Sequence, residues 1–446
     1  MPIAYCQLLN KVYTFKVKKI IVLGLFIATT FFVSAQKAEN IINVKEVERI
    51  ERVLAADEMK GRRVFSPEID KAADFIADEF KKAGLQTATG LTGFRQDFAI
   101  ITPKFVSASC TLDNENIDVK NVVVVTCQSG LNINEKSGYE KVRLEAGKNL
   151  NAEAQKFVRS GKNYIVLVDT SYSKNYSRLT NLKRGLFKMD NSVVFVMTII
   201  NPSTYSVEAR HEITEQKLAN VVGILPGKSK KDEYVIFSGH YDHIGISKQP
   251  VNGDSIYNGA NDDAAGTTAV IMLAKYFKAL GNNERTIVFA AFTAEESGGY
   301  GARYFSSQFD PEKVMAMFNI EMIGTESKWG KNSAYITGYE KTDMGAIMQK
   351  NLEGTGFTFH PDPYTDQNLF YRSDNATLAR LGVAAHTIST SKMDSEPNYH
   401  KVTDHVETLD MENMTMIIKS IALASRSIVA GKDTPTRVKM DDLRPM

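Results

Sequence analysis

Five short segments, all lying between Gly239 and His400, contain the residue types that a hydrolytic site with two metal ions requires. They are Gly239–Gly245, Gly259–Gly266, Thr293–Gly298, Asn319–Gly324 and Asn398–His400. Histidines and acids of this kind are common singly, so the prediction depends on finding all five segments together. Several of them fall at or just beyond apolar, strand-like runs, where an α/β sheet places its ligand-binding loops. The combination indicates a metal-dependent hydrolytic centre.

His240 and Asp242 follow a largely apolar run, residues 233–238, that is typical of a buried strand. Two metal ions about 3.5–4 Å apart need a bridging carboxylate and terminal imidazole and carboxylate ligands, and His240 is a candidate for an imidazole. On an extended backbone, Asp242 shares a face with His240. We expect its carboxylate to accept the second N–H of that imidazole and to fix the tautomer.

Asp262 and Asp263 lie in a turn that precedes a stretch with the apolar periodicity of a helix. Small residues on both sides of Asp262 indicate a backbone that approaches another group closely, and we assign Asp262 the bridging role. For Asp263 the sequence leaves two interpretations open. It is either a helix cap or a further part of the site.

Three more carboxylates accompany apolar runs. Glu295 and Glu296 come at the end of the run 286–293, and Glu321 follows the run 315–320. Adjacent carboxylates repel each other, so we expect a positive group beside at least one of the pair. Because their side chains diverge, one can bind a metal ion while the other stands over the attacking water. A charge such as that of Glu321 is costly in an apolar run unless it is paired or coordinated.

These segments resemble the co-catalytic di-zinc aminopeptidase family of metallopeptidases, whose relatives include glutamate carboxypeptidase-like enzymes and glutaminyl cyclases. The resemblance covers residues 218–430 and two N-terminal segments, 57–62 and 72–77. It implies two Zn²⁺ ions per chain. One zinc would be held by His240, Asp262 and Glu321 and the other by Asp262, Glu296 and His400, with Glu295 as general base, Asp242 orienting the histidine and Tyr399 polarising the scissile carbonyl.

The resemblance also implies that the peptide bond between Asp262 and Asp263 is cis. At Glu321 the chain departs from the family, which usually has aspartate there. The longer side chain still reaches a metal ion but changes the geometry of that zinc site.

We expect the remaining histidines not to be ligands: His211, His243, His360, His386 and His405. His243 follows Asp242 directly, so on an extended strand it faces away from His240. His405 competes with His400 for the last ligand position, and the pair Tyr399–His400 is the one that fits the family pattern.

The fold implied by the resemblance is α/β, a three-layer zinc-peptidase fold in which helices flank a mixed, mostly parallel central sheet. Residues 36–101 would form the N-terminal helices of this peptidase domain. Ser66 and Pro67 are a helix-start signal and Gly84 is a stop signal, which together predict a helix between them.

A β-rich insert is predicted over residues 102–216, which loosely resembles a protease-associated domain. Its expected strands are 122–125, 164–168 and 193–197. The di-zinc peptidase domain then occupies residues 217–430, with a last helix that begins near Asp410. Residues 431–446 are charged, contain proline and have the composition of a disordered tail.

Residues 1–35 have the pattern of a secretory signal peptide. Lys16, Lys18 and Lys19 precede the apolar run 20–33, and a small-residue cleavage site ends at Ala35. The run is shorter than the roughly 20 residues that a membrane span needs, although an uncleaved anchor remains an alternative. We therefore expect a secreted or periplasmic protein with no stable membrane association after cleavage.

Cleavage at this site would change the charge and the cysteine content of the chain. The whole chain has 54 Lys and Arg against 52 Asp and Glu, and four of the lysines lie within residues 1–35. The mature chain then has 50 basic and 52 acidic side chains, a net charge of −2, which gives no basis for nucleic-acid binding. Cys110 and Cys127 remain, either as a disulfide or as two free thiols.

The predicted function is a secreted zinc-dependent exopeptidase, foremost an aminopeptidase that hydrolyses N-terminal residues of peptide substrates. A metal-bridging water activated by Glu295 would attack the scissile carbonyl. The nearest rival is a carboxypeptidase or dipeptidase of the same fold, in which Arg372 would clamp a substrate carboxylate. A glutaminyl cyclase, which needs one metal, and a catalytically dead binding module are disfavoured by the full ligand set and by Glu295.

Overall fold

The computed structural model describes residues 40–443. Contacts within the chain divide it into two compact units. The main unit comprises the described residues up to Gln96 together with Ala219–Asp442, and the insert unit is Asp97–Leu218. The predicted signal peptide, residues 1–35, lies outside the described residues. Within residues 40–443, no helix is both long enough and apolar enough to cross a membrane.

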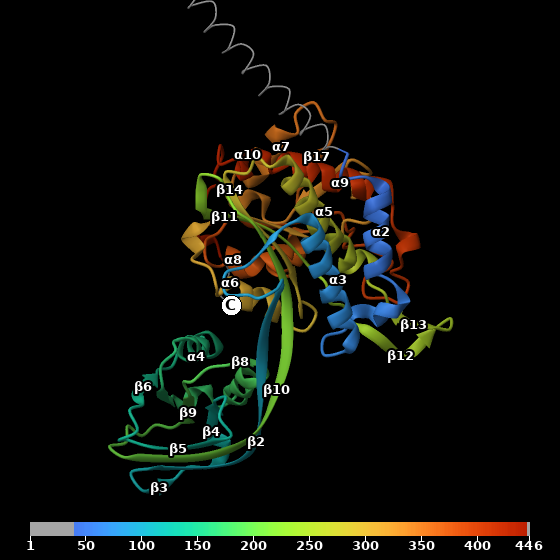
Figure 1. The fold of residues 1–446 in the computed structure, drawn as a ribbon. Helices are drawn as coiled ribbons and strands as arrows, with labels where there is room; N and C mark the ends of the chain where they lie inside the picture. The colour runs from blue at the N-terminus through green and yellow to red at the C-terminus, as the bar shows by residue number, and fades with distance from the viewer. Residues whose placement is uncertain (1–39, 444–446) are drawn as a thin grey trace, which may run out of the picture. The chain divides into compact units, whose positions relative to one another are not determined.

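The main unit is built on a mixed sheet with β11 (Lys230–His240) at its centre (Figure 1). β11 lies parallel to β14 (Arg285–Phe292) on one side and to β15 (Val314–Ile320) on the other. Beyond β15 come β18 (Ala385–Ser389), parallel to it, then β16 (Ser333–Ile336), antiparallel to β18, and β17 (Thr358–Pro361), parallel to β16. Beyond β14, β10 (Tyr205–Leu225) pairs antiparallel through its last residues, and β1 (Gln86–Thr87) pairs with β10. The sheet is mixed and mostly parallel, as predicted.

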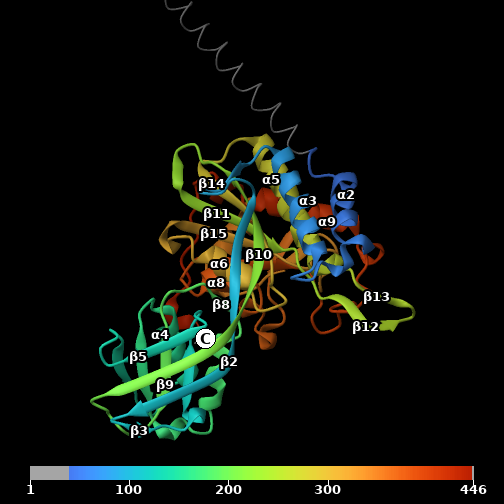
Figure 2. The ribbon, with the colours of Figure 1, turned by 60° about the horizontal axis from the view of Figure 1, so that its bottom comes forward.

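Helices cover both faces of this sheet (Figure 2). On one face pack α2 (Val44–Leu54), α3 (Pro67–Ala83), α5 (Ala265–Leu280), α7 (Met344–Asn351), α9 (Met411–Ala424) and α10 (Arg426–Val429). The other face holds α6 (Tyr300–Ser306) and α8 (Asn375–Ala379), and there the rings of Phe292 and Phe305 lie 5.0 Å apart between centroids. Because strand side chains alternate between faces, buried strands supply apolar residues to both layers. This arrangement confirms the predicted three-layer α/β fold.

An aromatic stack joins α5 to the three central strands. Phe237 of β11 lies in register between Phe289 of β14 and Phe318 of β15, with ring centroids 5.7 Å and 4.9 Å away. Phe277 of α5 stacks on the same ring at 5.4 Å. Burying each such side chain contributes about 1.5–3 kcal/mol. The stack therefore fixes α5, and the turn that begins it, against the sheet.

The helix predicted after Ser66 is α3, and it begins and ends where the sequence indicates. Pro67 is its first residue, and Gly84 follows its last with φ 75°, the left-handed conformation that glycine adopts without strain. Ser66 occupies the N-cap position, although its side chain makes no capping hydrogen bond.

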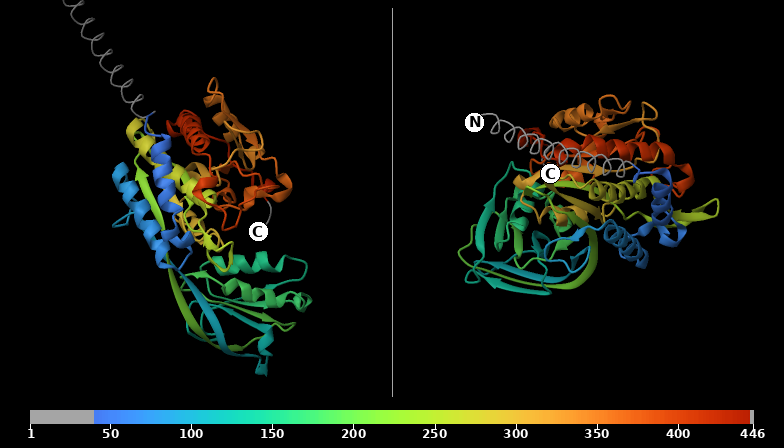
Figure 3. Two further views of the ribbon diagram at one scale, coloured as in Figure 1. Left: turned by 90° about the vertical axis from the view of Figure 1, so that its right-hand side faces the viewer. Right: turned by 45° about the horizontal axis from the view of Figure 1, so that its top comes forward.

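The insert unit is β-rich and contains a four-stranded sheet. Its order is β4 (Val122–Val125), β9 (Val193–Met197), β7 (Tyr164–Val168) and β6 (Glu140–Leu144), and the first three have the predicted bounds. α4 (Leu150–Arg159) and the 3-10 segment η4 (Tyr176–Lys183) pack on one face (Figure 3). The other face packs against β2 (Arg95–Leu112), β5 (Gly130–Asn134) and the first part of β10. Two short strands, β3 (Glu115–Asn116) and β8 (Leu186–Phe187), pair with β2.

Cys110 and Cys127 are free thiols. Cys110 is buried in the apolar cluster between the insert's four-stranded sheet and β2, whereas Cys127 packs against the cluster on the helical face. Because the two thiols belong to opposite faces of that sheet, the disulfide alternative is wrong for this conformation.

The expectation of a disordered tail was also wrong for residues 431–443. Arg437 donates to the carbonyl oxygens of Pro311 and Val314, at 2.9 and 3.1 Å, and the Val438 N–H donates to Gly382. Thr436 exchanges hydrogen bonds with Asp343. These contacts dock a polar segment on distant surfaces of the main unit, which local composition does not reveal.

Candidate metal centre and catalytic site

Three parallel strands bring the candidate ligands to one edge of the sheet. His240 is the last residue of β11, Glu321 directly follows β15, and Glu295 and Glu296 come three and four residues after the end of β14. Since β11, β14 and β15 run in the same direction, their carboxyl ends meet at this edge. The turn before α5 places Asp262 against the same edge.

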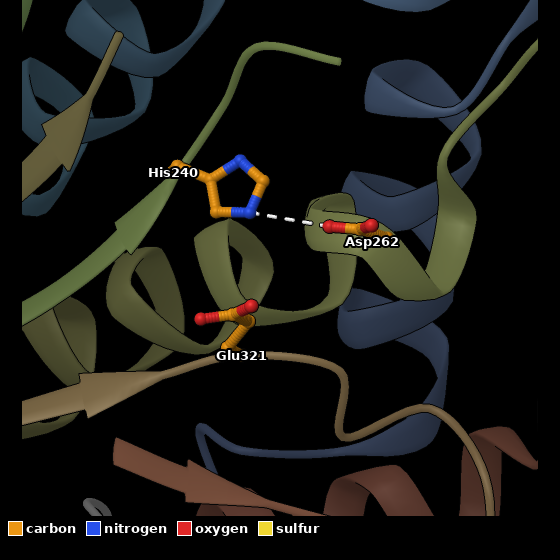
Figure 4. A group of neighbouring side chains, drawn as sticks. All are labelled: His240, Asp262 and Glu321. Carbon is orange, nitrogen blue, oxygen red and sulfur yellow. Dashed lines mark ion pairs between the residues drawn. The ribbon is translucent and has the colours of Figure 1, made fainter. Parts of the chain in front are cut away.

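Asp262 belongs to two groups of potential ligands. In the first, His240 Nε2 is 3.2 Å from Asp262 Oδ1, and Glu321 completes a set whose ligand atoms all lie within 4.8 Å of one another. Figure 4 shows the three side chains pointing toward a common space from β11, the turn before α5 and the end of β15. The side chain of Glu321 thus reaches the group despite its extra length.

The second group contains Asp262, Glu296 and two imidazoles. His400 Nε2 lies 3.2 Å from Asp262 Oδ2 and 3.2 Å from Glu296 Oε1. His243 Nδ1 lies 2.9 Å from the same Glu296 oxygen and 4.0 Å from Asp262 Oδ2. His243, Asp262 and Glu296 form a set within 4.8 Å. Two imidazoles therefore converge on one carboxylate oxygen.

The prediction that His243 faces away from the site was wrong. It assumed that the alternation of an extended strand continues past His240, but β11 ends at that residue. Beyond it the chain turns, and the His243 N–H donates to the carbonyl oxygen of Arg62 at 3.2 Å. The turn directs the His243 ring back toward Glu296.

Several buried atoms at this edge have no hydrogen-bond partner among residues 40–443. They include His243 Nε2, a nitrogen of the second group, and Glu321 Oε2, an oxygen of the first. Leaving buried polar atoms unsatisfied costs about 1–3 kcal/mol each. Nitrogen and oxygen donors arranged in this way are the ligands that zinc accepts in catalytic sites. The residues present fit two divalent cations that share Asp262.

The pKa values of Asp262 and of the imidazoles beside it are strongly shifted. Burial alone would raise the pKa of Asp262, but hydrogen bonds from His240 and His400 lower it. For His240, burial alone would lower the pKa, but the hydrogen bond with Asp262 and the charges of nearby acids hold it well above its ordinary value. Bonds to Asp262 and Glu296 raise the pKa of His400 to about 10. The acids of this edge thus require positive charge beside them.

Glu295 lines the pocket beside these groups and differs from its neighbour Glu296. Burial, together with the charges of Glu321, Asp374 and Asp242, raises the pKa of Glu295 well above its ordinary range, with His240 acting in the opposite direction. For Glu296, bonds from His243 and His400 overcome burial and lower the pKa to about 2. A carboxylate with a raised pKa is a stronger base and suits proton transfer, whereas one that stays ionised suits a ligand.

Asp242 connects His240 to the Glu295 segment, although not as predicted. His240 Nδ1 lies 3.1 Å from the backbone carbonyl oxygen of Asp242 and 3.8 Å from its carboxylate. The carboxylate instead accepts the backbone N–H of Glu295 at 3.0 Å. Hence the carbonyl oxygen is the atom placed to orient the imidazole, while the carboxylate holds the Glu295 loop.

Asp263 combines the two interpretations that the sequence left open. Its Oδ1 accepts the N–H of Gly266 at the start of α5 and that of Met322, both at 3.1 Å, and its Oδ2 accepts the N–H of His240 at 3.1 Å. It is a cap and also a tie between three site segments. The bond between Asp262 and Asp263 is cis, as predicted.

Arg62 supports the site through hydrogen bonds to backbone carbonyl groups, and the sequence analysis did not identify this role. The fully buried guanidinium donates to four backbone carbonyl oxygens: Leu54 at 2.6 Å, Tyr241 at 2.8 Å, Asn258 at 2.6 Å and Gly259 at 2.8 Å. These bonds join the segment after His240 to the turn that holds Asp262. Asp404 adds to the support by accepting the N–H groups of Asn261 and Asp262. The only local signal is an arginine within the N-terminal segment 57–62.

Four histidines lie apart from the ligand groups. His405 pairs with Asp254 at 3.1 Å, in β13 (Asp254–Tyr257), which forms a hairpin with β12 (Gly245–Val251). His360 stacks on Trp329, and His386 bonds to Thr337 and Thr342. His211 belongs to the insert unit.

A pocket opens over the cluster, and its lining includes Asp262, Glu295, Glu296, Glu321 and His400. Tyr399 and Arg372 also line it. The Tyr399 ring stacks on His400 with centroids 4.0 Å apart. Burial and the charges of Asp262, Glu321 and Glu296 raise the pKa of Tyr399 to about 12, and the charge of Arg372 opposes them.

Comparisons with known proteins agree with this geometry. Residues 220–425 match the family model for peptidase family M28. A probable leucine aminopeptidase of Trichophyton verrucosum is 28% identical over 205 residues, which cover 44% of this chain and 53% of that protein. A probable zinc metalloprotease of Pyrenophora teres f. teres is 36% identical over 238 residues, 50% of each chain. The chain spans about half the length of these curated relatives.

Among solved structures, an aminopeptidase from Aneurinibacillus sp. strain AM-1 superimposes with a TM-score of 0.52 at 16% identity, covering 92% of this chain and 98% of that one. At this identity the likeness concerns the fold alone. Together with the family match, it confirms the resemblance to the zinc aminopeptidase-like metallopeptidases.

Proposed function

We propose that this chain, whose residues 220–425 match peptidase family M28, is a secreted zinc-dependent aminopeptidase with two metal ions. The observation that supports this most directly is the pair of ligand groups that share Asp262. A shared carboxylate between two sets of N and O donors is the arrangement that a two-ion hydrolytic centre needs. The buried ligand atoms without hydrogen-bond partners in the described chain support the same proposal.

His240, Asp262 and Glu321 would hold one ion, and Asp262, Glu296 and His400 the other. When bound, two such ions acidify water and polarise a carbonyl group. Glu295 takes the proton from the attacking water and returns it to the leaving amine. Tyr399 donates its phenolic hydrogen to the carbonyl oxygen as negative charge develops there. Asp242 keeps Glu295 in place through the 3.0 Å bond to its backbone N–H.

His243 adds an orienting role to this scheme. At 2.9 Å, its Nδ1–H is within hydrogen-bond distance of Glu296 Oε1. A neutral imidazole that donates to a ligating carboxylate fixes the orientation of that ligand and tunes its basicity. Glu296 would then be held by His243 on one side while it binds the ion on the other.

The second candidate is a carboxypeptidase or dipeptidase of the same fold. The specific observation in its favour is that Arg372 lines the pocket, where a guanidinium suits a substrate carboxylate. Substrates with free or blocked ends separate the two candidates. An aminopeptidase requires a free N-terminal amine and tolerates a blocked C-terminus, whereas a carboxypeptidase has the opposite requirements.

Metal analysis of the purified mature protein, combined with this substrate panel, tests the proposal. We expect about two zinc ions per chain, loss of activity after chelation, and recovery on adding zinc. A protein with a negligible metal content and no hydrolysis would instead be a binding module. N-terminal sequencing of the protein exported by its host tests secretion, for which we expect a chain that begins at Gln36.

A further inference from the structure

Arg372 is the one lysine or arginine among the described residues that line the pocket. The other charged groups there are the acids Asp262, Glu295, Glu296 and Glu321, and the imidazole of His400. All of these already have a place in the metal centre or in proton transfer. Arg372 has no such place, so its charge remains to be explained.

The guanidinium of Arg372 makes no hydrogen bond or ion pair within residues 40–443. The two fully buried arginines of the main unit behave differently. Arg62 donates to four carbonyl oxygens, and Arg285 bonds to Glu233, Thr434 and two carbonyl oxygens. Those side chains serve the fold, whereas the donors of Arg372 are available to a ligand in the pocket.

Three hydroxyl groups of the lining are already used within the protein. Ser373 accepts a hydrogen bond from Asn319 at 2.7 Å, Thr387 donates to Asn375 at 2.9 Å, and Ser389 donates to Met322 at 3.2 Å. They build the wall of the pocket, and Arg372 is the cationic side chain of the lining whose donors have no partner within residues 40–443.

We propose that the Arg372 guanidinium binds a carboxylate of the substrate and so makes this enzyme prefer peptides that carry a carboxylate within one residue of the scissile bond. A planar guanidinium matches a carboxylate with two parallel hydrogen bonds. It also offsets the acids that would otherwise repel an anionic substrate. The inference rests on the proposed peptidase function, whose attacked carbonyl lies at Tyr399, a residue of the same pocket.

The carboxylate has two possible sources on a short peptide. It is either the acidic side chain of the N-terminal residue or the free α-carboxylate of a dipeptide. Either carboxylate would have to enter the pocket that Arg372 and Tyr399 both line. The chemistry at Arg372 is the same in both cases, so substrates must distinguish them.

Steady-state kinetics of the zinc-loaded enzyme with four substrates provides the test. Leucine amide is the neutral reference, glutamate α-amide carries a side-chain carboxylate, and Leu-Gly is compared with Leu-Gly amide for the terminal carboxylate. For Arg372→Ala we expect kcat/KM to fall about 10- to 100-fold on the carboxylate-bearing substrate, from the usual strength of charge-assisted hydrogen bonds, mainly through KM. The loss on leucine amide, which carries no carboxylate, should be much smaller than on that substrate.

Two variants complete the design. Arg372→Lys keeps the charge but loses the paired geometry, so its loss on the same substrate should be intermediate. Arg178→Ala, which removes an exposed arginine of the insert unit, should leave all four substrates unchanged. The substrate that responds to Arg372→Ala identifies the source of the carboxylate.

Equal losses of kcat on all substrates would overturn the inference, because Arg372 would then act on the reaction rather than on a carboxylate. Unchanged kinetics on every substrate would overturn it as well. Both results leave the peptidase proposal intact, since that is judged by wild-type hydrolysis of leucine amide. If wild-type enzyme hydrolyses none of the four, calorimetric binding of free glutamate to wild type and to Arg372→Ala still decides whether Arg372 binds a carboxylate, and equal affinities would reject it.

Discussion

The two units of the chain bury polar groups in very different ways. In the insert unit, the buried polar residues among those described are Thr126, Asn191, Ser192, Thr198 and His211, with no acid, lysine or arginine. The main unit buries acids, arginines and imidazoles together, most of them near the carboxyl edge of its sheet. A core without charged groups avoids the free-energy cost of removing charges from water. Buried charge is costly, and here it coincides with the candidate metal centre.

This difference predicts which property a substitution in each unit should change. Within the main unit, buried charged side chains such as Arg62 and Asp263 form hydrogen bonds that position the segments around Asp262. Within the insert unit, the buried side chains of the sheet are mostly apolar and stabilise it by packing on its two faces. Substitutions in the main unit should therefore change metal binding and turnover, while those in the insert core should change stability.

The largest effect is expected at Glu295. Glu295→Gln keeps the size of the side chain but removes proton transfer, so kcat should fall about 10²- to 10⁴-fold with both zinc ions retained. Glu296→Gln is the matched control: it should lose zinc at one site first and recover part of its activity in excess zinc. A Glu295→Gln protein that is zinc-depleted and rescued by zinc would require the two roles to be exchanged.

A second prediction separates the two imidazoles at Glu296. His400→Ala should lose one zinc ion and nearly all activity, because its Nε2 lies equally close to Asp262 and Glu296. His243→Ala should bind both ions at saturating zinc, with an affinity at that site lower by about 10- to 100-fold. Zinc titration followed by elemental analysis measures both, and His405→Ala serves as the control. The reverse order for His400 and His243 would assign the ligand role to His243.

Arg62 should show a smaller effect on turnover that comes through positioning. Arg62→Ala leaves four buried carbonyl oxygens without their donor, which should destabilise the main unit by about 3 kcal/mol or more. It should also weaken zinc binding, since the turn that holds Asp262 loses its support. Arg62→Lys should restore part of both. Chemical unfolding and zinc titration on the same samples provide the measurement, and unchanged zinc affinity in a destabilised Arg62→Ala protein would limit Arg62 to a structural role.

Glu51 allows the cost of buried charge to be measured away from the ligands. Burial raises its pKa to about 8, although Thr268 donates to it at 2.8 Å. The unfolded chain ionises near the ordinary value of 4.5, so the folded state binds more protons between that pH and about 8. Its contribution to stability is therefore greatest below about 4.5 and is lost as pH rises toward 8. Glu51→Gln should flatten this part of the stability–pH curve, and an unchanged slope would contradict the raised pKa.

The smallest effect on turnover is expected in the insert unit. Phe195 is fully buried there, and Phe195→Ala should cost about 3–5 kcal/mol of stability. Zinc content and kcat measured at a temperature where the protein stays folded should not change. A drop in kcat with full zinc occupancy would show that the insert contributes to the chemistry and would break the contrast between the units.

Local pattern was sufficient for much of this structure. Strands 122–125, 164–168 and 193–197 were predictable because continuous apolar runs of that length suit buried strands. His240, Glu295, Glu296 and Glu321 were predictable because each lies at or just beyond the end of a strand, and these strand ends meet at the same edge. The position of His243 was not, since it depends on where β11 stops and on the hydrogen bond from its N–H to the carbonyl oxygen of Arg62. The docking of Arg437 and the separation of the two cysteines depend equally on partners that are remote in sequence.

The four bonds of the Arg62 guanidinium have a consequence for the order in which the chain can fold. Three of their acceptors are 179, 196 and 197 residues away in sequence, beyond the whole insert unit. Arg62 is synthesised first and has no partners at Tyr241, Asn258 or Gly259 until those residues emerge. Contacts with such long loops form late, because closure entropy is lost before they contribute. A fragment limited to residues 217–430 contains every candidate ligand but lacks this donor, and it would leave those carbonyl groups unpaired next to the candidate metal centre.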